Sequence, residues 1–139
     1  MALILLMALG CGEATPRQYE TTKSNDTVQV SVIRPALSDA ALAGEVLFNA
    51  NCSLCHGANA AGTHQGPPLI HKIYEPGHHS DFSFRNAVRR GVRQHHWQFG
   101  DMAPVAGISS EEVDQIICYI REMQRANGIF DGDAFGTQC

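Results

Sequence analysis

The sequence lacks several features that define common functional classes. Because 14 acidic residues outnumber 10 basic ones, the net charge is −4, and no nucleic-acid partner is indicated. Aromatic residues occupy only 7% of the 139 positions, which is little for the core of a single domain. No apolar run approaches the roughly 20 residues that a membrane-spanning helix needs. A second pair of closely spaced cysteines is also absent, which argues against a four-cysteine zinc site.

The most informative stretch is the pentapeptide Cys52-Ser53-Leu54-Cys55-His56. It has the form C-x-x-C-H, the attachment signature of a c-type haem. Each thiol can form a thioether with one vinyl group of the haem, and His56 can then bind the iron. A bare C-x-x-C also occurs in dithiol redox motifs and in halves of zinc sites. The adjacent histidine, with no βαβ pattern and no second ligand pair, favours one covalently attached haem c per chain.

The N-terminal residues predict export from the cytoplasm. The segment 1–10 is apolar but too short to cross a bilayer, and it suits the hydrophobic region of an export signal. Ala8-Leu9-Gly10-Cys11 resembles a bacterial lipobox, in which the cysteine is acylated. The alternative is an ordinary signal cleaved near Gly12 or Ala14. In either case we expect a periplasmic location or one on the outer face of the membrane, with Cys11 as the site of a lipid anchor.

Composition divides the chain into an export segment, a polar tether, a haem domain and a tail, at residues 1–11, 12–37, 38–130 and 131–139. Within the tether, Val28, Val30 and Val32 alternate with polar residues, which is the pattern of a short strand. Arg34-Pro35 would end that strand quickly. The tether therefore contains, at most, one isolated strand.

Helix caps and apolar spacing predict the first helix of the haem domain. Ser38 can cap a helix over residues 39–51, and Ala41, Gly44 and Phe48 share one face of it. Glycine costs about 1 kcal/mol relative to alanine inside a helix. We therefore expect Gly44 to allow another backbone to approach closely.

Two further helices are predicted later in the chain. Asp81 or Ser83 can cap a helix that runs to Arg90. Ser109 and Glu112 form a capping box that begins a helix at Ser110, which continues to about residue 127. The predicted buried stripe of this last helix consists of Val113, Ile116, Ile117, Ile120 and Met123.

The order of several motifs resembles that of the class I c-type cytochromes. The matching features, over roughly residues 38–128, are Gly44, Phe48, the Cys52–His56 motif, Gly66-Pro67-Pro68-Leu69 and Met102. The resemblance implies an all-α cytochrome c fold of three to five helices around one haem, with the N- and C-terminal helices crossing. It also implies that the Pro67 carbonyl accepts a hydrogen bond from His56, and that Leu69 packs on the haem.

The same resemblance implies that Met102 is the second axial ligand of the iron. Met102 lies in a loop bounded by Gly100 and Pro104, just before the last helix. The alternative is a loop methionine that only packs on the core. Trp97, five residues earlier, has an indole N–H that needs a partner when buried, either a haem propionate or a group in the core.

The other histidines and cysteines have separate interpretations. His78, His79, His95 and His96 occur as two adjacent pairs, and neighbouring positions do not share a face, so we interpret them as surface histidines. Cys118 is predicted to point away from the buried stripe of the last helix. If Cys11 is acylated and the motif cysteines hold haem, the remaining thiols are those of Cys118 and Cys139, and we hypothesise that they form a disulfide.

These features predict a monomeric, mono-haem, one-electron carrier rather than an enzyme. The resemblance suggests a quinol-oxidising complex as electron donor and a terminal oxidase or periplasmic reductase as acceptor. Two alternatives remain open at this point. One is the electron-entry subunit of a larger dehydrogenase or reductase. The other is a haem enzyme or gas sensor with a labile sixth ligand, in which His95 or His96 acts near the distal face.

Overall fold

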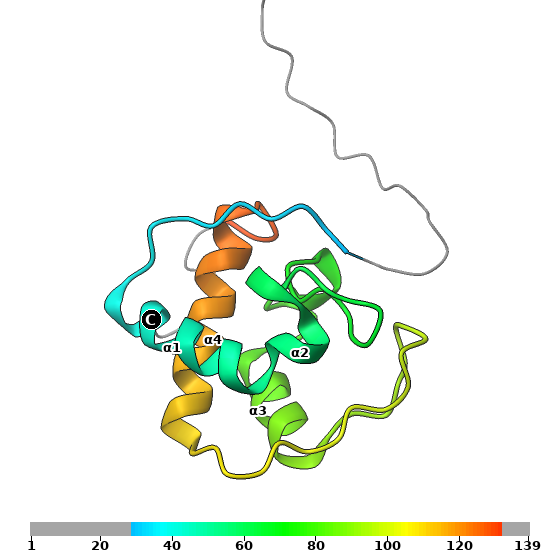
Figure 1. Cartoon of the computed structure of the whole chain (residues 1–139). Helices are drawn as coiled ribbons and strands as arrows, with labels where there is room; N and C mark the ends of the chain where they lie inside the picture. The colour runs from blue at the N-terminus through cyan, green and yellow to red at the C-terminus, as the bar shows by residue number, and fades with distance from the viewer. Residues whose placement is uncertain (1–28, 132–139) are drawn as a thin grey trace, which may run out of the picture.

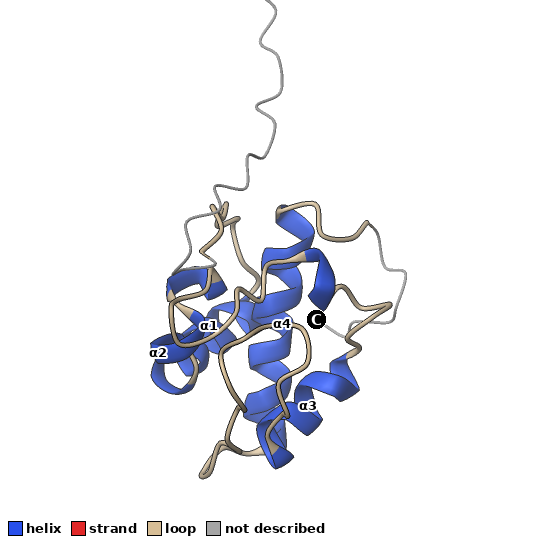
Figure 2. Cartoon of the chain, turned by 90° about the vertical axis from the view of Figure 1, so that its right-hand side faces the viewer, coloured by secondary structure: helices blue, strands red, loops and turns tan. Residues whose placement is uncertain are grey.

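The computed structural model describes residues 29–131 and is helical (Figures 1 and 2). Its elements in order are α1 (Asp39–Asn51), α2 (Ser53–His56), the 3₁₀ turns η1 (Ala58–Ala60) and η2 (Lys72–Tyr74), α3 (Asp81–Arg90) and α4 (Ser110–Ala126). Within the described range no strand forms, and the single β-bridge joins Val92 to Met102. The predicted all-α architecture is confirmed.

The first and last helices cross at a glycine, as predicted. The Ser38 side chain accepts a hydrogen bond from the Ala41 amide and thereby caps α1. A Cβ atom added to Gly44 would lie only 1.9 Å from the carbonyl oxygen of Gln115 in α4. Beside this contact the rings of Phe48 and Tyr119 pack with their centroids 5.4 Å apart. Figure 1 shows α1 passing in front of α4 at this point.

Helix α4 begins as the sequence predicts but is buried over more of its surface. Both hydrogen bonds of the capping box between Ser109 and Glu112 are formed. The buried set extends beyond the predicted stripe to Cys118, Arg121 and Gln124. The prediction that Cys118 lies off the core is therefore wrong, since this residue is 2% exposed and belongs to the main hydrophobic cluster. One apolar stripe does not predict this burial, because the middle of α4 is enclosed on nearly every side.

Two local predictions need correction. The cap of α3 is Ser80, one residue before the earlier of the two predicted caps, because Asp81 lies in the first turn and pairs with Arg121. The described part of the tether forms no strand. Instead the Val30 amide donates to the carbonyl of Ala61, and Val30 and Val32 pack against the helical core.

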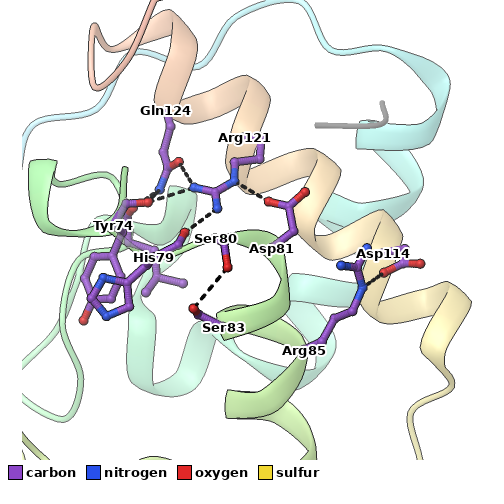
Figure 3. A network of polar contacts seen from close by, with 10 residues as sticks. Tyr74, His79, Ser80, Asp81, Ser83, Arg85, Asp114, Arg121 and Gln124 are labelled. Atoms are coloured by element: carbon purple, nitrogen blue, oxygen red, sulfur yellow. Dashed lines mark hydrogen bonds and ion pairs between the residues drawn. The ribbon is translucent and has the colours of Figure 1, made fainter. Parts of the chain in front are cut away.

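A buried arginine on α4 ties the segment before α3 to the core (Figure 3). Arg121 is 0% exposed, and its Nε donates to Asp81 at 2.8 Å. Its two Nη atoms donate to the carbonyls of Tyr74 at 2.8 Å and His79 at 2.6 Å, and Nη1 also donates to Gln124. The backbone of residues 74–79 is therefore fixed by one guanidinium group.

We expect Arg121→Met to destabilise the fold by about 2–3 kcal/mol, because it leaves the His79 carbonyl and the partly buried Asp81 carboxylate without this donor. Arg85→Met is the matched control, since Arg85 pairs with Asp114 at 2.6 Å but both side chains are about half exposed. Exposed pairs contribute about 0–1 kcal/mol. Urea unfolding followed by circular dichroism measures both variants, and equal losses would contradict a special role for Arg121.

Candidate functional site

The two motif cysteines lie on a short helical turn that continues α1. The Cys52 amide donates to the Phe48 carbonyl at 2.8 Å, and the amides of Cys55 and His56 both donate to the Cys52 carbonyl. Cys52 is partly buried, Cys55 is exposed, and both are free thiols. Burial, with the neighbouring Cys55, raises the pKa of the Cys52 thiol to about 11. At neutral pH this sulfur is therefore protonated.

The motif histidine has one ring nitrogen bound and one available. Nδ1 of His56 lies 2.9 Å from the carbonyl oxygen of Pro67, which can only accept, so Nδ1 carries the proton. Nε2 then has the lone pair needed to bind a metal ion. Burial lowers the pKa of His56, although the Pro67 carbonyl opposes this shift. The hydrogen bond that the resemblance implied is confirmed, and it orients the ring as in metal-ligating histidines.

Glycines allow the loop after the motif to return to His56. Gly57 has a φ of +76°, and a Cβ atom there would lie 2.5 Å from the Gly62 carbonyl oxygen. The Gly62 amide donates to the His56 carbonyl at 2.7 Å. Gly66 packs on the motif itself, since a Cβ atom at this position would lie 2.9 Å from the Cys55 carbonyl oxygen. This close packing leads the chain directly to Pro67.

Met102 is held on a separate hairpin, formed by residues 92–102. Its amide and carbonyl both pair with Val92, each over 2.9 Å. Gly91, with a φ of +74°, packs against this pair, because a Cβ atom there would lie 2.3 Å from the Met102 carbonyl oxygen. After Met102, the Val105 amide donates to the Val88 carbonyl of α3. The end of α3 therefore fixes the backbone of Met102, whose side chain is partly buried.

The structure thus gathers Cys52, the N-cap of α2, with Cys55 and His56 on that helix, and holds Met102 on the hairpin. In Figure 1, α2 and the hairpin lie on the same side of α4. Leu69, which was expected to contact the haem, is 8% exposed and belongs to the hydrophobic core.

Trp97 presents a buried donor that has no acceptor among the described residues. Its Nε1 atom is inaccessible to solvent and makes no hydrogen bond there. Burial raises the pKa of the nearby Tyr74 hydroxyl to about 12, and the indole of Trp97 opposes this shift, but no hydrogen bond with good geometry joins the two groups. An orphaned donor on the hairpin that carries Met102 fits a group that brings its own acceptor, such as a carboxylate of a bound cofactor.

The two histidine pairs lie at the surface, as predicted, with His78, His95 and His96 exposed and His79 half-buried, but they form one cluster. His78 and His79 precede α3, whereas His95 and His96 lie on the hairpin, and the two pairs meet. The rings of His79 and His96 pack with centroids 5.2 Å apart. The adjacent rings within each pair are also in contact, so the expectation that neighbouring histidines stay apart is wrong.

The comparisons with known proteins agree with the fold and with the motif. The family model for cytochrome c matches residues 41–124, which is more than half of the chain. The chain therefore belongs to the cytochrome c family, whose members bind covalently attached haem c. None of the curated proteins gives a significant match.

A solved structure supports the same assignment. The crystal structure of cytochrome CL from the marine methylotrophic bacterium Methylophaga aminisulfidivorans is similar, with 30% sequence identity and a TM-score of 0.50. The match covers 61% of this chain and 53% of cytochrome CL, so the chain spans about half of that protein. Among the described helices, none has the length and apolar character needed to span a membrane.

Proposed function

We propose that the chain is a mono-haem, one-electron carrier in which Cys52 and Cys55 hold the haem and His56 and Met102 are the axial ligands. The observation that carries the proposal is the hydrogen bond from His56 Nδ1 to Pro67, immediately after two free thiols. It presents the remaining ring nitrogen as a ligand in the same turn that supplies both sulfurs.

Attachment requires no net oxidation or reduction. Each cysteine S–H would add across one vinyl C=C bond, so that an S–C and a C–H bond form as the S–H bond and the π bond of the vinyl group break. When bound, the haem iron supplies the change between ferrous and ferric states. The Pro67 carbonyl keeps His56 in one tautomer, and Trp97 would donate its indole N–H to a propionate.

The axial pair favours transfer of electrons over binding of substrate. With His56 and Met102 both bound, the iron has no open position, so the protein has no catalytic role of its own. We infer that it is exported and lipid-anchored through Cys11, which lies outside the described residues. Its partners would then be a quinol-oxidising complex and a terminal oxidase or periplasmic reductase.

Met102→Ala tests the ligand set. A thioether stabilises ferrous iron and raises the reduction potential, so we expect the potential to fall by on the order of 0.1 V. The ligand-field and magnetic circular dichroism spectra should change with it, and ferrous protein should bind carbon monoxide rapidly.

Met123→Leu is the matched control for Met102→Ala. Met123 is the other methionine in the described range and is 0% exposed in the core, so a change of similar volume should leave the spectrum and the potential unaltered. A Met102→Ala protein with the wild-type spectrum would remove Met102 from the ligand set and favour the alternative of a different or labile sixth ligand.

A further inference from the structure

The histidines of the 78–79 turn and the hairpin form a cluster with the dimensions of a metal site. Nε2 of His78 lies 3.2 Å from Nε2 of His96, although 18 positions separate the two residues. One ring nitrogen each of His78, His79 and His96 can be chosen so that all three atoms lie within 4.8 Å of one another. His78 and His96 are exposed and His79 is half-buried, so the cluster opens to solvent.

These separations are close to those around a tetrahedral metal ion. Zinc binds imidazole nitrogen at about 2.0–2.1 Å, so two nitrogens on one ion lie about 3.3 Å apart. The pair from His78 and His96 already has nearly that spacing. Because the three ligand nitrogens lie within 4.8 Å of one another, the nitrogen of His79 would need to move by at most about 1.5 Å, which lies within the reach of rotation about side-chain bonds.

The Nδ1 atom of the half-buried His79 already makes the kind of hydrogen bond that is found in metal-ligating histidines. Nδ1 of His79 donates to the carbonyl of Ile73 at 2.7 Å, which leaves Nε2 with its lone pair. Metal-ligating histidines almost always donate their second N–H to such an acceptor. Next to it, Nδ1 of His95 donates to the Arg93 carbonyl, and the His95 ring stacks on that of His79. His95 therefore supports the cluster from the side.

The backbone on one side of the cluster is rigid. The His79 carbonyl accepts from the buried Arg121, and the His79 amide donates to Glu75. On the other side, the hairpin is closed by Val92 and Met102, and the Gln94 amide donates to Asp101. Two independently fixed segments thus present their imidazoles to one point, which lowers the entropy cost of binding an ion between them.

We propose that His78, His79 and His96 bind a divalent first-row transition-metal ion that favours imidazole ligands, of which zinc and copper are the leading examples. Three neutral imidazoles and one solvent molecule complete a four-coordinate site. The ion would join the turn before α3 to the hairpin that carries Met102. The site shares no residue with the Cys52–His56 motif or with Met102, so it does not require Met102 to be the sixth ligand of the haem.

Titration of the purified full-length protein with Zn²⁺ by isothermal calorimetry tests the site. We expect one ion per chain with a Kd of about 1 μM or tighter, and zinc-edge X-ray absorption should show nitrogen ligands at about 2.0–2.1 Å with imidazole scattering. His96→Ala and His79→Ala should each weaken binding at least tenfold. His64→Ala is the matched control, because His64 is exposed and belongs to no part of the cluster.

Each outcome decides the question. Stoichiometric binding that His96→Ala and His79→Ala reduce, and His64→Ala does not, supports the site. The proposal is overturned if no binding is seen at a Zn²⁺ concentration 100-fold above the expected Kd. It is also overturned if His96→Ala binds Zn²⁺ as tightly as the wild type. His96 is exposed, so its replacement is expected to leave the fold intact, and far-ultraviolet circular dichroism verifies this. Failure of the haem-ligand experiment with Met102 would leave the zinc result unaffected.

Discussion

A chain in which Cys52 and Cys55 are both replaced by serine is expected to carry no covalently bound haem. A hydroxyl group does not add across a vinyl group as a thiol does, so neither thioether can form. His56 alone would leave the haem free to dissociate on unfolding. Intact-mass spectrometry and haem staining of a denaturing gel measure the result, and each single variant should retain one thioether.

Leu54→Ser is the matched control, because it changes the same turn without removing a sulfur. Leu54 is 81% exposed, and its replacement should leave haem attachment complete. A double cysteine variant that still holds haem after denaturation would show that another residue makes the covalent link. The assignment of Cys52 and Cys55 would then be wrong, even though the fold is that of the family.

Local sequence determines the turn around the haem motif, which is why it could be predicted. Two thiols and an imidazole within five positions can only share one turn of backbone. The loop from His56 to Pro67 must fold back closely for the Pro67 carbonyl to reach the His56 ring. Glycines allow this close packing, and the structure has it at Gly57 and Gly66. Here the chemistry is carried by residues that are near one another in the chain.

The histidine cluster could not be predicted in this way, because it joins two segments. The rings within each pair also pack together, with centroids 4.7 Å apart for His78 and His79 and 4.3 Å apart for His95 and His96. Only the turn fixed by Arg121 and the hairpin closed at Val92 bring the two pairs together. The sequence contains no periodic signal for such a contact.

The burial of α4 was underestimated for a related reason. A stripe of apolar residues identifies one buried face, but Arg121 and Gln124 are fully buried on another. Their polar groups are satisfied by backbone carbonyls of distant residues, such as Leu69 and Tyr74. Charged residues give no sign of burial in the sequence when their partners belong to loops. The prediction that Cys118 lies off the core failed for the same reason, since this residue is 2% exposed. Cys118 is disulfide-bonded, as hypothesised, but Cys139 lies outside the described residues, so the identity of its partner stays a prediction.

Gly44→Ala is expected to destabilise the protein by about 3 kcal/mol, near the upper end for overpacked positions. A methyl group at Gly44 would lie 1.9 Å from the Gln115 carbonyl oxygen and 2.5 Å from its carbon, and both belong to the backbone of α4. No side-chain rotation can relieve this overlap, so the two helices must separate. The gain of about 1 kcal/mol in helix propensity offsets only part of the cost.

Gly44→Val should destabilise the protein more than Gly44→Ala, because it places more atoms at the helix crossing. The loss would be a large part of the total stability of a folded domain, which is only about 5–15 kcal/mol. Two further methyl groups at the crossing would separate α1 from α4 and expose Phe48 and Tyr119. Val46→Ala is the control on the same helix, since Val46 is 70% exposed and should change stability little. Thermal unfolding of the haem-loaded proteins gives the comparison. A lower melting temperature is expected in the order Gly44→Val, Gly44→Ala, wild type, and a Gly44→Ala protein as stable as the wild type would mean that α1 and α4 do not meet at this glycine.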